Sequence, residues 1–159
     1  MKIVDKSSGE ELLAIIEEIA TSDYIKIKKD KGFKFDWEEE KENEVYKIYL
    51  KNNEGNILGL VSFIEIPSDL RIHLNLIEVS SNHVGRSKKF DNIAGCLIAF
   101  GCAIAFKRGY GGFLSLHPKT KLIDLYQDKY GFRQFGRYLA VEFESSKFSV
   151  DKYIGDEEI

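Results

Sequence analysis

The segment from Asn82 to Gly95 carries the residues best suited to chemistry, because basic side chains are followed there by small ones. Small residues let the backbone approach a ligand, and the unpaired N–H groups of a helix's first turn favour an anion. Arg86, Lys88 and Lys89 add positive charge. The pattern predicts a phosphate or pyrophosphate site, with an exposed basic loop as the alternative. The other predicted contacts are Phe90, Asp91, Asn92, Ile93, Ala94 and Gly95.

Hydrophobic periodicity predicts the elements that must position this loop. The spacing Ser8-Gly9-Glu10-Glu11 is that of a capping box, which favours a helix directly after it. Short turns between 45 and 80 favour an antiparallel meander, and the order strand, loop, apolar helix, strand from 70 to 117 indicates a parallel β-α-β unit. We expect strands at 2–5, 45–51, 57–66, 70–80, 113–117 and within 132–143, and helices at 12–20, 92–107 and 119–130.

The fold class that follows is α/β, with a mixed central sheet flanked by helices. The first half of the sheet is expected to be antiparallel and the second half parallel. The helix over 92–107 is apolar nearly all round, so other elements must cover most of its sides. Residues 24–43 show no clear periodicity, although Phe33, Phe35 and Trp37 alternate with polar residues as in a strand or an extended loop.

Composition narrows the class of protein. The 159 residues, 43% hydrophobic and 31% charged, fit one globular domain over 1–159. A net charge of −3 argues against nonspecific nucleic-acid binding. The longest apolar run, over 93–106, is too short to span a membrane, and no secretory signal is present, so we expect a cytoplasmic protein. The acidic stretches 36–44 and 151–159 are expected to be solvated surface or a fraying tail.

Cysteine and histidine usage is sparse. Cys96 and Cys102 lie six residues apart in an expected helix, too far apart for a disulfide with each other, and no other cysteine is present. The three histidines and two cysteines are too few, at their spacings, for a zinc site, so we expect no metal.

From about residue 56 to 136 the chain resembles the Gcn5-related N-acetyltransferase (GNAT) superfamily. The family's loop between its fourth strand and third helix has the pattern Arg/Gln-x-x-Gly-x-Gly/Ala. Residues 89–94 keep a basic first position, Lys89, and a small last one, Ala94, but Asn92 stands where glycine is usual, with Gly95 nearby. The family often ends its core with a helical tyrosine shortly before Gly-Phe, as in the segment LYQDKYGF at 125–132. Seven residues before Tyr126, where asparagine commonly contacts pantetheine, this chain has Lys119.

The resemblance implies transfer of an acetyl group from acetyl-CoA to a primary amine by direct attack in a ternary complex. It implies that Tyr126 protonates the leaving CoA thiolate, with packing in an apolar helix face as the alternative. It also implies an oxyanion donor in a backbone N–H near Val79. The acetyl-CoA-binding core would cover about 56–136.

The amine must lose a proton, and Glu78, near the end of the strand entering the loop, is the leading base candidate. Strict alternation places it on one face with apolar residues, where a carboxylate needs partners; an exposed or salt-bridged Glu78 is the alternative. His117, at the end of a strand, is the second candidate, because histidine titrates near neutral pH. Its alternative role is to cap the next helix. Glu65 is a third candidate, water a fourth, and His73 and His83 are expected at the surface.

The acceptor stays open between a small-molecule amine, a peptide N-terminus and a protein lysine. The aromatic residues at 33, 35 and 37, together with the acidic stretch 36–44, favour a cationic amine. Two alternatives remain: a non-catalytic acyl-CoA-binding domain, and a toxin-like acetyltransferase acting on aminoacyl-tRNA, against which the acidic charge balance argues. A homodimer is compatible with the family.

Overall fold

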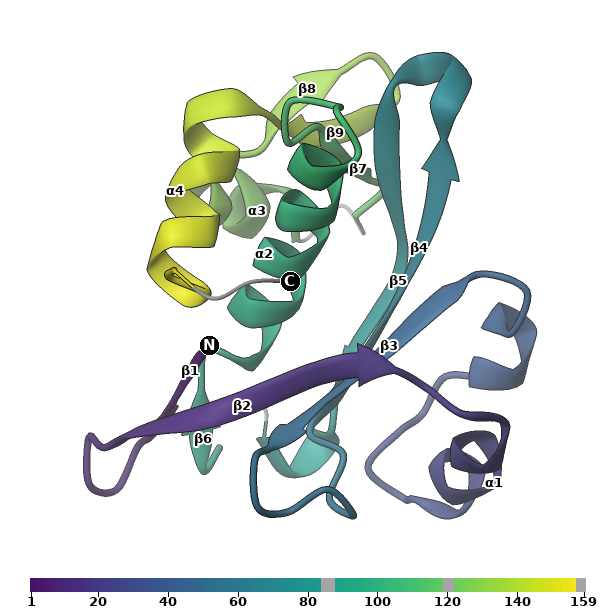
Figure 1. Ribbon diagram of the computed structural model, residues 1–159, viewed down its shortest axis with the longest axis vertical. Helices are drawn as coiled ribbons and strands as arrows, with labels where there is room; N and C mark the ends of the chain where they lie inside the picture. Colours follow the sequence, from purple (N-terminus) through teal and green to yellow (C-terminus); the bar gives the residue numbers. More distant parts are fainter. Residues whose placement is uncertain (84–87, 119–121, 157–159) are drawn as a thin grey trace. The chain divides into compact units, whose positions relative to one another are not determined.

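The computed structural model describes residues 1–83, 88–118 and 122–156. Figure 1 shows the helices and strands of this part of the chain. In order they are β1 (Lys2–Asp5), β2 (Glu11–Glu18), α1 (Thr21–Lys29), η1 (Trp37–Glu40), β3 (Glu44–Leu50), β4 (Gly59–Ile66), η2 (Pro67–Asp69), β5 (Arg71–Val79), η3 (Ser81–His83), β6 (Phe90–Asp91), α2 (Ile93–Lys107), β7 (Leu114–Leu116), α3 (Ile123–Tyr130), β8 (Arg133–Phe135), β9 (Tyr138–Val141) and α4 (Phe143–Tyr153).

The strands hydrogen-bond in the order β6-β1-β2-β3-β4-β5-β7-β9-β8. β5 and β7 are parallel, with Ile72 opposite Leu114, whereas β1–β2, β2–β3, β7–β9 and β8–β9 are antiparallel. The predicted α/β class, the mixed sheet and the β-α-β unit formed by β5, α2 and β7 are therefore confirmed. The expectation of a parallel second half holds for the β5–β7 pair but is wrong for β9 and β8, because the chain returns from β8 to β9 as an antiparallel hairpin.

Contacts divide the chain into two compact units. The first comprises the described residues of 1–62 and 76–97, and the second those of 63–75 and 98–159. β4, β5 and α2 each contribute residues to both units. The predicted phosphate loop belongs to the first unit, and α3 belongs to the second.

The prediction of a helix over 12–20 is wrong, because this segment is strand β2. Ser8 does not cap a helix; its Oγ accepts a hydrogen bond from the Glu10 backbone N–H at 3.2 Å, and Gly9 has a φ of 74°. The resulting turn lets β1 and β2 pair as an antiparallel hairpin. β2 also pairs with β3. The hydrophobic pattern of this segment fits a helix as well as a strand, and the cross-strand hydrogen bonds on both sides favour the strand.

The first helix instead covers α1, in the stretch without clear periodicity. The Asp23 carboxylate accepts a hydrogen bond from the Ala20 N–H at 2.8 Å and so satisfies a donor where the helix begins. The same carboxylate binds the Lys47 ammonium of β3 at 3.1 Å, and both side chains are buried. This ion pair fastens α1 to the sheet of the first unit.

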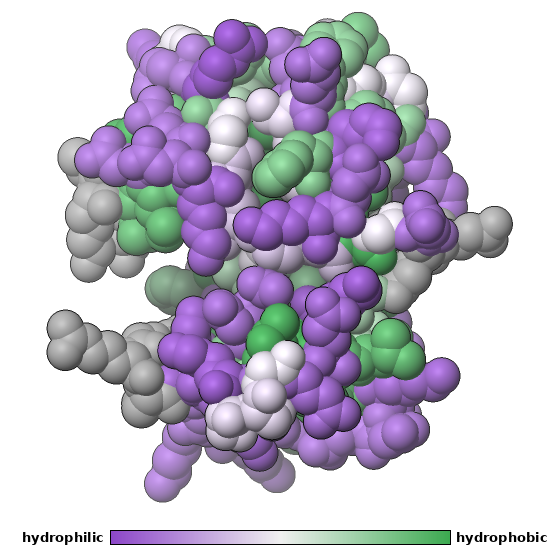
Figure 2. Space-filling view, turned by 90° about the vertical axis from the view of Figure 1, so that its left-hand side faces the viewer, coloured by the Kyte–Doolittle hydropathy of each residue, from purple (hydrophilic) through white to green (hydrophobic). Residues whose placement is uncertain are grey.

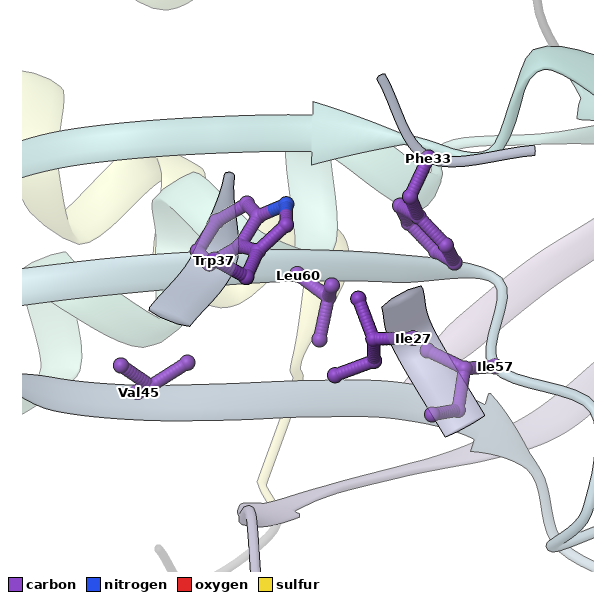
Figure 3. Close-up of a cluster of buried hydrophobic side chains, with 6 residues drawn as sticks. All are labelled: Ile27, Phe33, Trp37, Val45, Ile57 and Leu60. Carbon is purple, nitrogen blue, oxygen red and sulfur yellow. The ribbon is translucent and has the colours of Figure 1, made fainter. Parts of the chain in front are cut away.

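Apolar side chains from α1, η1 and the segment between them form a core cluster with residues of β3, β4 and the turn before β4 (Figure 3). Ile27, Phe33 and Trp37 point toward the strand residues, with Leu60 at the centre of the group. Trp37 is only 2% exposed. The cluster members are Ile27, Phe33, Trp37, Val45, Ile57 and Leu60.

Close approach explains one glycine of α2. A Cβ on Gly101 would lie 2.6 Å from the Phe63 ring and 3.0 Å from Leu114, so the second unit has no room for a side chain there. α2 spans Ile93 to Lys107, which confirms the predicted apolar helix, and Cys96 and Cys102 within it are buried and not joined by a disulfide.

The expectation that the acidic C-terminal stretch is solvated is wrong for part of it. α4 was not predicted, and Tyr153 and Ile154, within a stretch expected to be solvated, are each only 2% exposed. The other acidic stretch is also partly internal, because Glu40 is buried and accepts a hydrogen bond from the Ser62 hydroxyl at 2.5 Å. Acidic composition alone therefore did not reveal which carboxylates have partners.

Figure 2 shows one face of the molecule, where apolar residues form small separate groups among hydrophilic side chains. Among the described residues, no helix is long and apolar enough to cross a membrane. The described part of the chain also contains no group of three or more His, Cys, Asp or Glu side chains placed to hold a metal ion.

Candidate functional site

The predicted phosphate loop is anchored by its second half. β6 pairs with β1, with Val4 opposite Asp91, and the Lys6 N–H donates to the Lys89 carbonyl at 3.0 Å. Phe90 between them is buried, and its ring lies 5.3 Å from that of His83. The hairpin of β1 and β2 therefore fixes the backbone from which α2 starts.

Asn92 has a φ of 74°, the left-handed conformation that glycine adopts most readily. Asparagine is one of the few other residues that visit this region routinely. The Cys96 N–H donates to the Asn92 carbonyl at 2.9 Å, so helical hydrogen bonding begins directly at this residue. Asparagine thus supplies the backbone conformation at the position where the resembling family usually has glycine.

Charge at the start of α2 is balanced by a local ion pair. The Lys88 ammonium lies 2.8 Å from the Asp91 carboxylate, which also accepts a hydrogen bond from the Asn92 N–H at 2.9 Å. Lys89 is exposed, and its ammonium lies 5.2 Å from the centroid of the Phe90 ring. Arg86, predicted in the same loop, lies outside the described residues.

The first turn of α2 contains the remaining predicted contacts. Ile93 and Gly95 are buried, whereas Ala94 is half-buried. The N–H groups of a first helical turn have no partner within the helix, which makes this turn suited to an anion.

Glu78 is buried at the end of β5 and is held by three N–H donors. The backbone N–H of Lys34 lies 2.6 Å from its carboxylate, that of Phe35 3.3 Å and the indole Nε1 of Trp37 2.8 Å. Three hydrogen bonds offset the cost of burying a carboxylate. The partners expected for a carboxylate on the apolar face of this strand are therefore present. The predicted role of Glu78 as a base remains a prediction.

Val79 is the last residue of β5 and is half-buried. The next N–H, that of Ser80, is taken by the Leu58 carbonyl at 2.9 Å. The predicted backbone oxyanion donor near Val79 remains a prediction.

Tyr126 lies on α3 and is 9% exposed. Its ring packs against Tyr130, with centroids 6.0 Å apart, and edge-on against Phe132 at 5.6 Å. Burial raises the pKa of the Tyr126 hydroxyl, so it stays protonated at neutral pH. α3 ends at Gly131, which has a φ of 74°. Four residues separate Tyr126 from that glycine, and Lys119 lies outside the described residues.

His117 follows β7 and is exposed. Its Nδ1 donates to the Arg137 carbonyl at 3.0 Å, which leaves Nε2 as the nitrogen able to take a proton. Its ring lies 5.1 Å from that of His73 and 6.1 Å from that of Tyr138.

The expectation that His73 is a surface residue is wrong. It is 9% exposed, and its Nδ1 lies 2.8 Å from the Ser115 hydroxyl. Arg71 donates to that hydroxyl at 2.6 Å and lies 3.2 Å from the same Nδ1. Burial, Arg71 and His117 together lower the pKa of His73 to about 4. His83, also expected at the surface, is half-buried, and burial followed by Lys89 lowers its pKa.

Glu65, the third base candidate, is engaged on both carboxylate oxygens. Arg108 donates to one oxygen at 2.7 Å, and the Tyr110 hydroxyl donates to the other at 2.6 Å. These contacts join β4 to the end of α2 in the second unit.

Solved structures similar to this chain are acetyltransferases. A GNAT-family acetyltransferase from Staphylococcus aureus Mu50 matches with a TM-score of 0.59 and 14% identity, over 83% of this chain and 100% of its own. AtaTR bound with acetyl-CoA matches with a TM-score of 0.58 and 12% identity, over 85% and 96%. The spermidine/spermine N-acetyltransferase SpeG from Vibrio cholerae matches with a TM-score of 0.55 and 17% identity, over 85% and 94%.

The protein has the GNAT fold. At these identities the likeness concerns the fold alone. No protein-family model matches the chain, and no curated protein does.

Within the GNAT fold, the candidate site residues are divided between the two units. The phosphate loop, Glu78 and Val79 belong to the first, whereas Tyr126, His117 and Glu65 belong to the second. Two contacts do not follow from the prediction. One joins Trp37 to Glu78, and only tertiary structure reveals it. The other is the group around Ser115, for which polar residues at paired positions of two apolar, neighbouring strands are a signal in the sequence.

Proposed function

We propose that this protein is an N-acetyltransferase that transfers the acetyl group of acetyl-CoA to a primary amine. The GNAT fold supports the reaction class, and a solved structure with this fold holds acetyl-CoA. The observation that carries the proposal is the turn at Asn92. A left-handed residue directly before an apolar helix, with Lys88 and Lys89 beside it, is suited to the pyrophosphate of CoA.

In the proposed reaction the neutral amine nitrogen attacks the thioester carbonyl carbon while both substrates are bound. The carbonyl oxygen becomes an oxyanion, which the backbone N–H near Val79 would stabilise. Collapse of this intermediate breaks the C–S bond, and the electron pair leaves with the CoA sulfur. Tyr126 donates its phenolic proton to the thiolate and regains a proton from solvent after the products leave, and these products are an amide and free CoA.

The proton of the amine passes to His117 or to water. Glu78 is the less suitable acceptor, because its carboxylate already accepts three N–H hydrogen bonds that protonation would weaken. Nε2 of His117 is not committed to the Arg137 carbonyl. A pH–rate profile that loses its acidic limb in His117→Asn assigns the base to the histidine.

A thermal shift with acetyl-CoA, with free CoA and pyrophosphate as controls, tests the proposal. A ligand at about 100 times its Kd stabilises a protein by about 2.7 kcal/mol, which raises Tm by several degrees at about 2–4 °C per kcal/mol. We expect the shift with acetyl-CoA and CoA, and a smaller one after Lys88→Ala together with Lys89→Ala. The matched control is Lys51→Ala, an exposed lysine of the turn after β3. No shift at millimolar acetyl-CoA would contradict the proposal.

A further inference from the structure

His117 is exposed, but contacts on several sides fix the orientation of its ring. Its Nδ1 donates to the Arg137 carbonyl at 3.0 Å. Its ring lies 5.1 Å from the ring of His73, at an angle of 57°, and meets the ring of Tyr138 edge-on at 6.1 Å. An exposed side chain without such contacts changes rotamer within nanoseconds. The ring of His117 is therefore ordered in a place where packing does not require order.

The strand pairing does not supply this orientation. Pairing of β5 with β7 ends at Leu74 and Leu116, although β5 continues to Val79. His117 directly follows the last residue of β7. Its side chain must be oriented by the groups that pack against it, and His73 and Tyr138 belong to β5 and β9, the two strands that flank β7.

A buried hydrogen-bonded group fixes His73 in turn. Arg71 donates to the Ser115 hydroxyl at 2.6 Å and to Nδ1 of His73 at 3.2 Å. Ser115 is fully buried, and its hydroxyl lies 2.8 Å from the same Nδ1. Because this hydroxyl accepts from Arg71, it donates to His73, and the proton of the neutral His73 ring resides on Nε2. The place and the tautomer of His73 are therefore both determined.

Arg71 also braces the second ring that contacts His117. Its guanidinium lies over the Tyr138 ring, 4.4 Å from the centroid. Its Nε donates to the Asp69 carboxylate at 3.2 Å. A cation over an aromatic face is attracted to it, so one arginine holds both rings between which His117 is oriented.

His73 contributes a ring without a charge. Burial, followed by Arg71 and His117, lowers the pKa of His73 to about 4, so its imidazole is neutral at pH 7. The charge of Arg71 is accompanied by the carboxylate of Asp69. A proton taken up by His117 therefore does not meet a second imidazolium ion beside it.

We propose that His73 and Tyr138 are positioning residues, which hold the imidazole of His117 as its Nδ1–H tautomer and leave Nε2 as the proton acceptor. Arg71 and Ser115 keep the two supporting rings in place. The inference rests on the proposed function for the source of the proton, whereas the tautomer and its supports are properties of the protein alone. In the reaction Nε2 takes the proton that the amine nitrogen loses as the amide forms, and the imidazolium returns it to water after the products leave.

Nitrogen-15 NMR of the imidazoles tests the positioning without any substrate, at a mildly alkaline pH where the rings are neutral. The chain has three histidines, so the variants His73→Phe, His83→Asn and His117→Asn assign every signal. We expect His117 to be mainly the Nδ1–H tautomer, because the Arg137 carbonyl can only accept, whereas a free imidazole in water prefers the Nε2–H tautomer. The Nε2–H tautomer, or the mixture of a free imidazole, would overturn the proposal.

Variants of the supporting residues localise the effect. His73→Ala removes one ring and should move His117 toward the mixture of a free imidazole, whereas His73→Phe keeps a ring there and should restore the Nδ1–H tautomer. Ser115→Ala should have a smaller effect, since it removes a hydrogen bond to His73 but not the ring. Leu114→Ala is the matched control, because Leu114 is buried on the other face of the same strand. Equal responses of the His117 tautomer to His73→Ala and Leu114→Ala would overturn the role of His73.

Turnover links the positioned ring to the reaction. In His73→Ala and in Tyr138→Ala, kcat should fall about tenfold while KM for acetyl-CoA stays within about twofold, because a displaced base loses part of the ~100-fold that such a group contributes. His73→Phe and Tyr138→Phe should recover most of kcat. Unchanged kcat in both alanine variants would overturn the positioning role.

Failure of this inference can be told apart from failure of the proposed function. If the wild type acetylates amines and His117→Asn leaves both kcat and the acidic limb of the pH–rate profile unchanged, acetyl transfer stands but the positioned nitrogen is not the base, and the inference is wrong. If the wild type acetylates no amine, the proposed function is wrong, and the role of His117 in proton transfer fails with it.

Discussion

Glu78 and Tyr126 are both buried, but they are buried among different groups. Three N–H donors surround the carboxylate of Glu78. The ring of Tyr126 packs against Tyr130 and Phe132, and burial raises the pKa of its hydroxyl. Surroundings that satisfy a charge tie a residue to the architecture, whereas apolar surroundings keep the Tyr126 phenol neutral. We propose Tyr126 for proton transfer and an architectural role for Glu78.

The largest expected effect on stability is that of Glu78→Ala. The buried indole N–H of Trp37 and two part-buried backbone N–H groups would lose their acceptor, so the free energy of unfolding should fall by about 3 kcal/mol. Glu65→Ala is the matched control, because Glu65 also accepts two hydrogen bonds but is about one-third exposed. We expect the free energy of unfolding to fall by about 1 kcal/mol in Glu65→Ala, as measured by urea denaturation. Equal losses in the two variants would show that the hydrogen bonds of Glu78 stabilise the fold no more than those of Glu65.

Tyr126→Phe should lower kcat about 100-fold, since the leaving thiolate loses its proton donor. Its Tm and the Kd for acetyl-CoA should hardly change, because the ring contacts remain. Tyr130→Phe, a neighbouring buried tyrosine of the same helix, is the control and should keep kcat within about threefold. Steady-state kinetics on any amine that the wild type acetylates provides the measurement. Unchanged turnover in Tyr126→Phe would show that the ring only packs.

His73 extends the comparison to a buried base. Its pKa of about 4 lies below the ordinary 6.5, so the unfolded chain takes up the proton first as pH falls. Stability is therefore full above pH 6.5 and declines as pH falls toward 4, by about 1–2 kcal/mol once solvent screening is included. His73→Asn should remove this part of the pH dependence, as followed by thermal unfolding from pH 7 to 4. An unchanged profile would contradict the assignment to His73.

The strands and the apolar helix of the β-α-β unit could be predicted because their patterns are unambiguous and local turns bound them. β2 could not be predicted, because the spacing of its apolar residues fits a helix as well as a strand that is half-buried on both faces. These residues are Leu12, Ile15, Ile16 and, directly after β2, Ile19. α1 is short and mostly polar outside its two buried residues, and α4 buries serines, so neither shows an apolar stripe.

The candidate site was predictable where it depends on the backbone. Asn92 could be suspected of a left-handed conformation, because it replaces a glycine in the resembling pattern, and its φ of 74° agrees. The three partners of Glu78 lie more than 40 residues away in the chain, so no local pattern encodes them. Only the fold brings the carboxylate of β5 to the segment before η1.

The central claim is acetyl transfer to an amine, and release of free CoA tests it most directly. Protein, acetyl-CoA and a panel of amines that includes hexylamine would be mixed with a thiol reagent. Cys96 and Cys102 add little background, because burial raises the pKa of each thiol to about 12. The account predicts thiol release that depends on both protein and amine, with a product heavier by one acetyl group. Binding of acetyl-CoA without amine-dependent thiol release would contradict it and would indicate a non-catalytic acyl-CoA-binding protein.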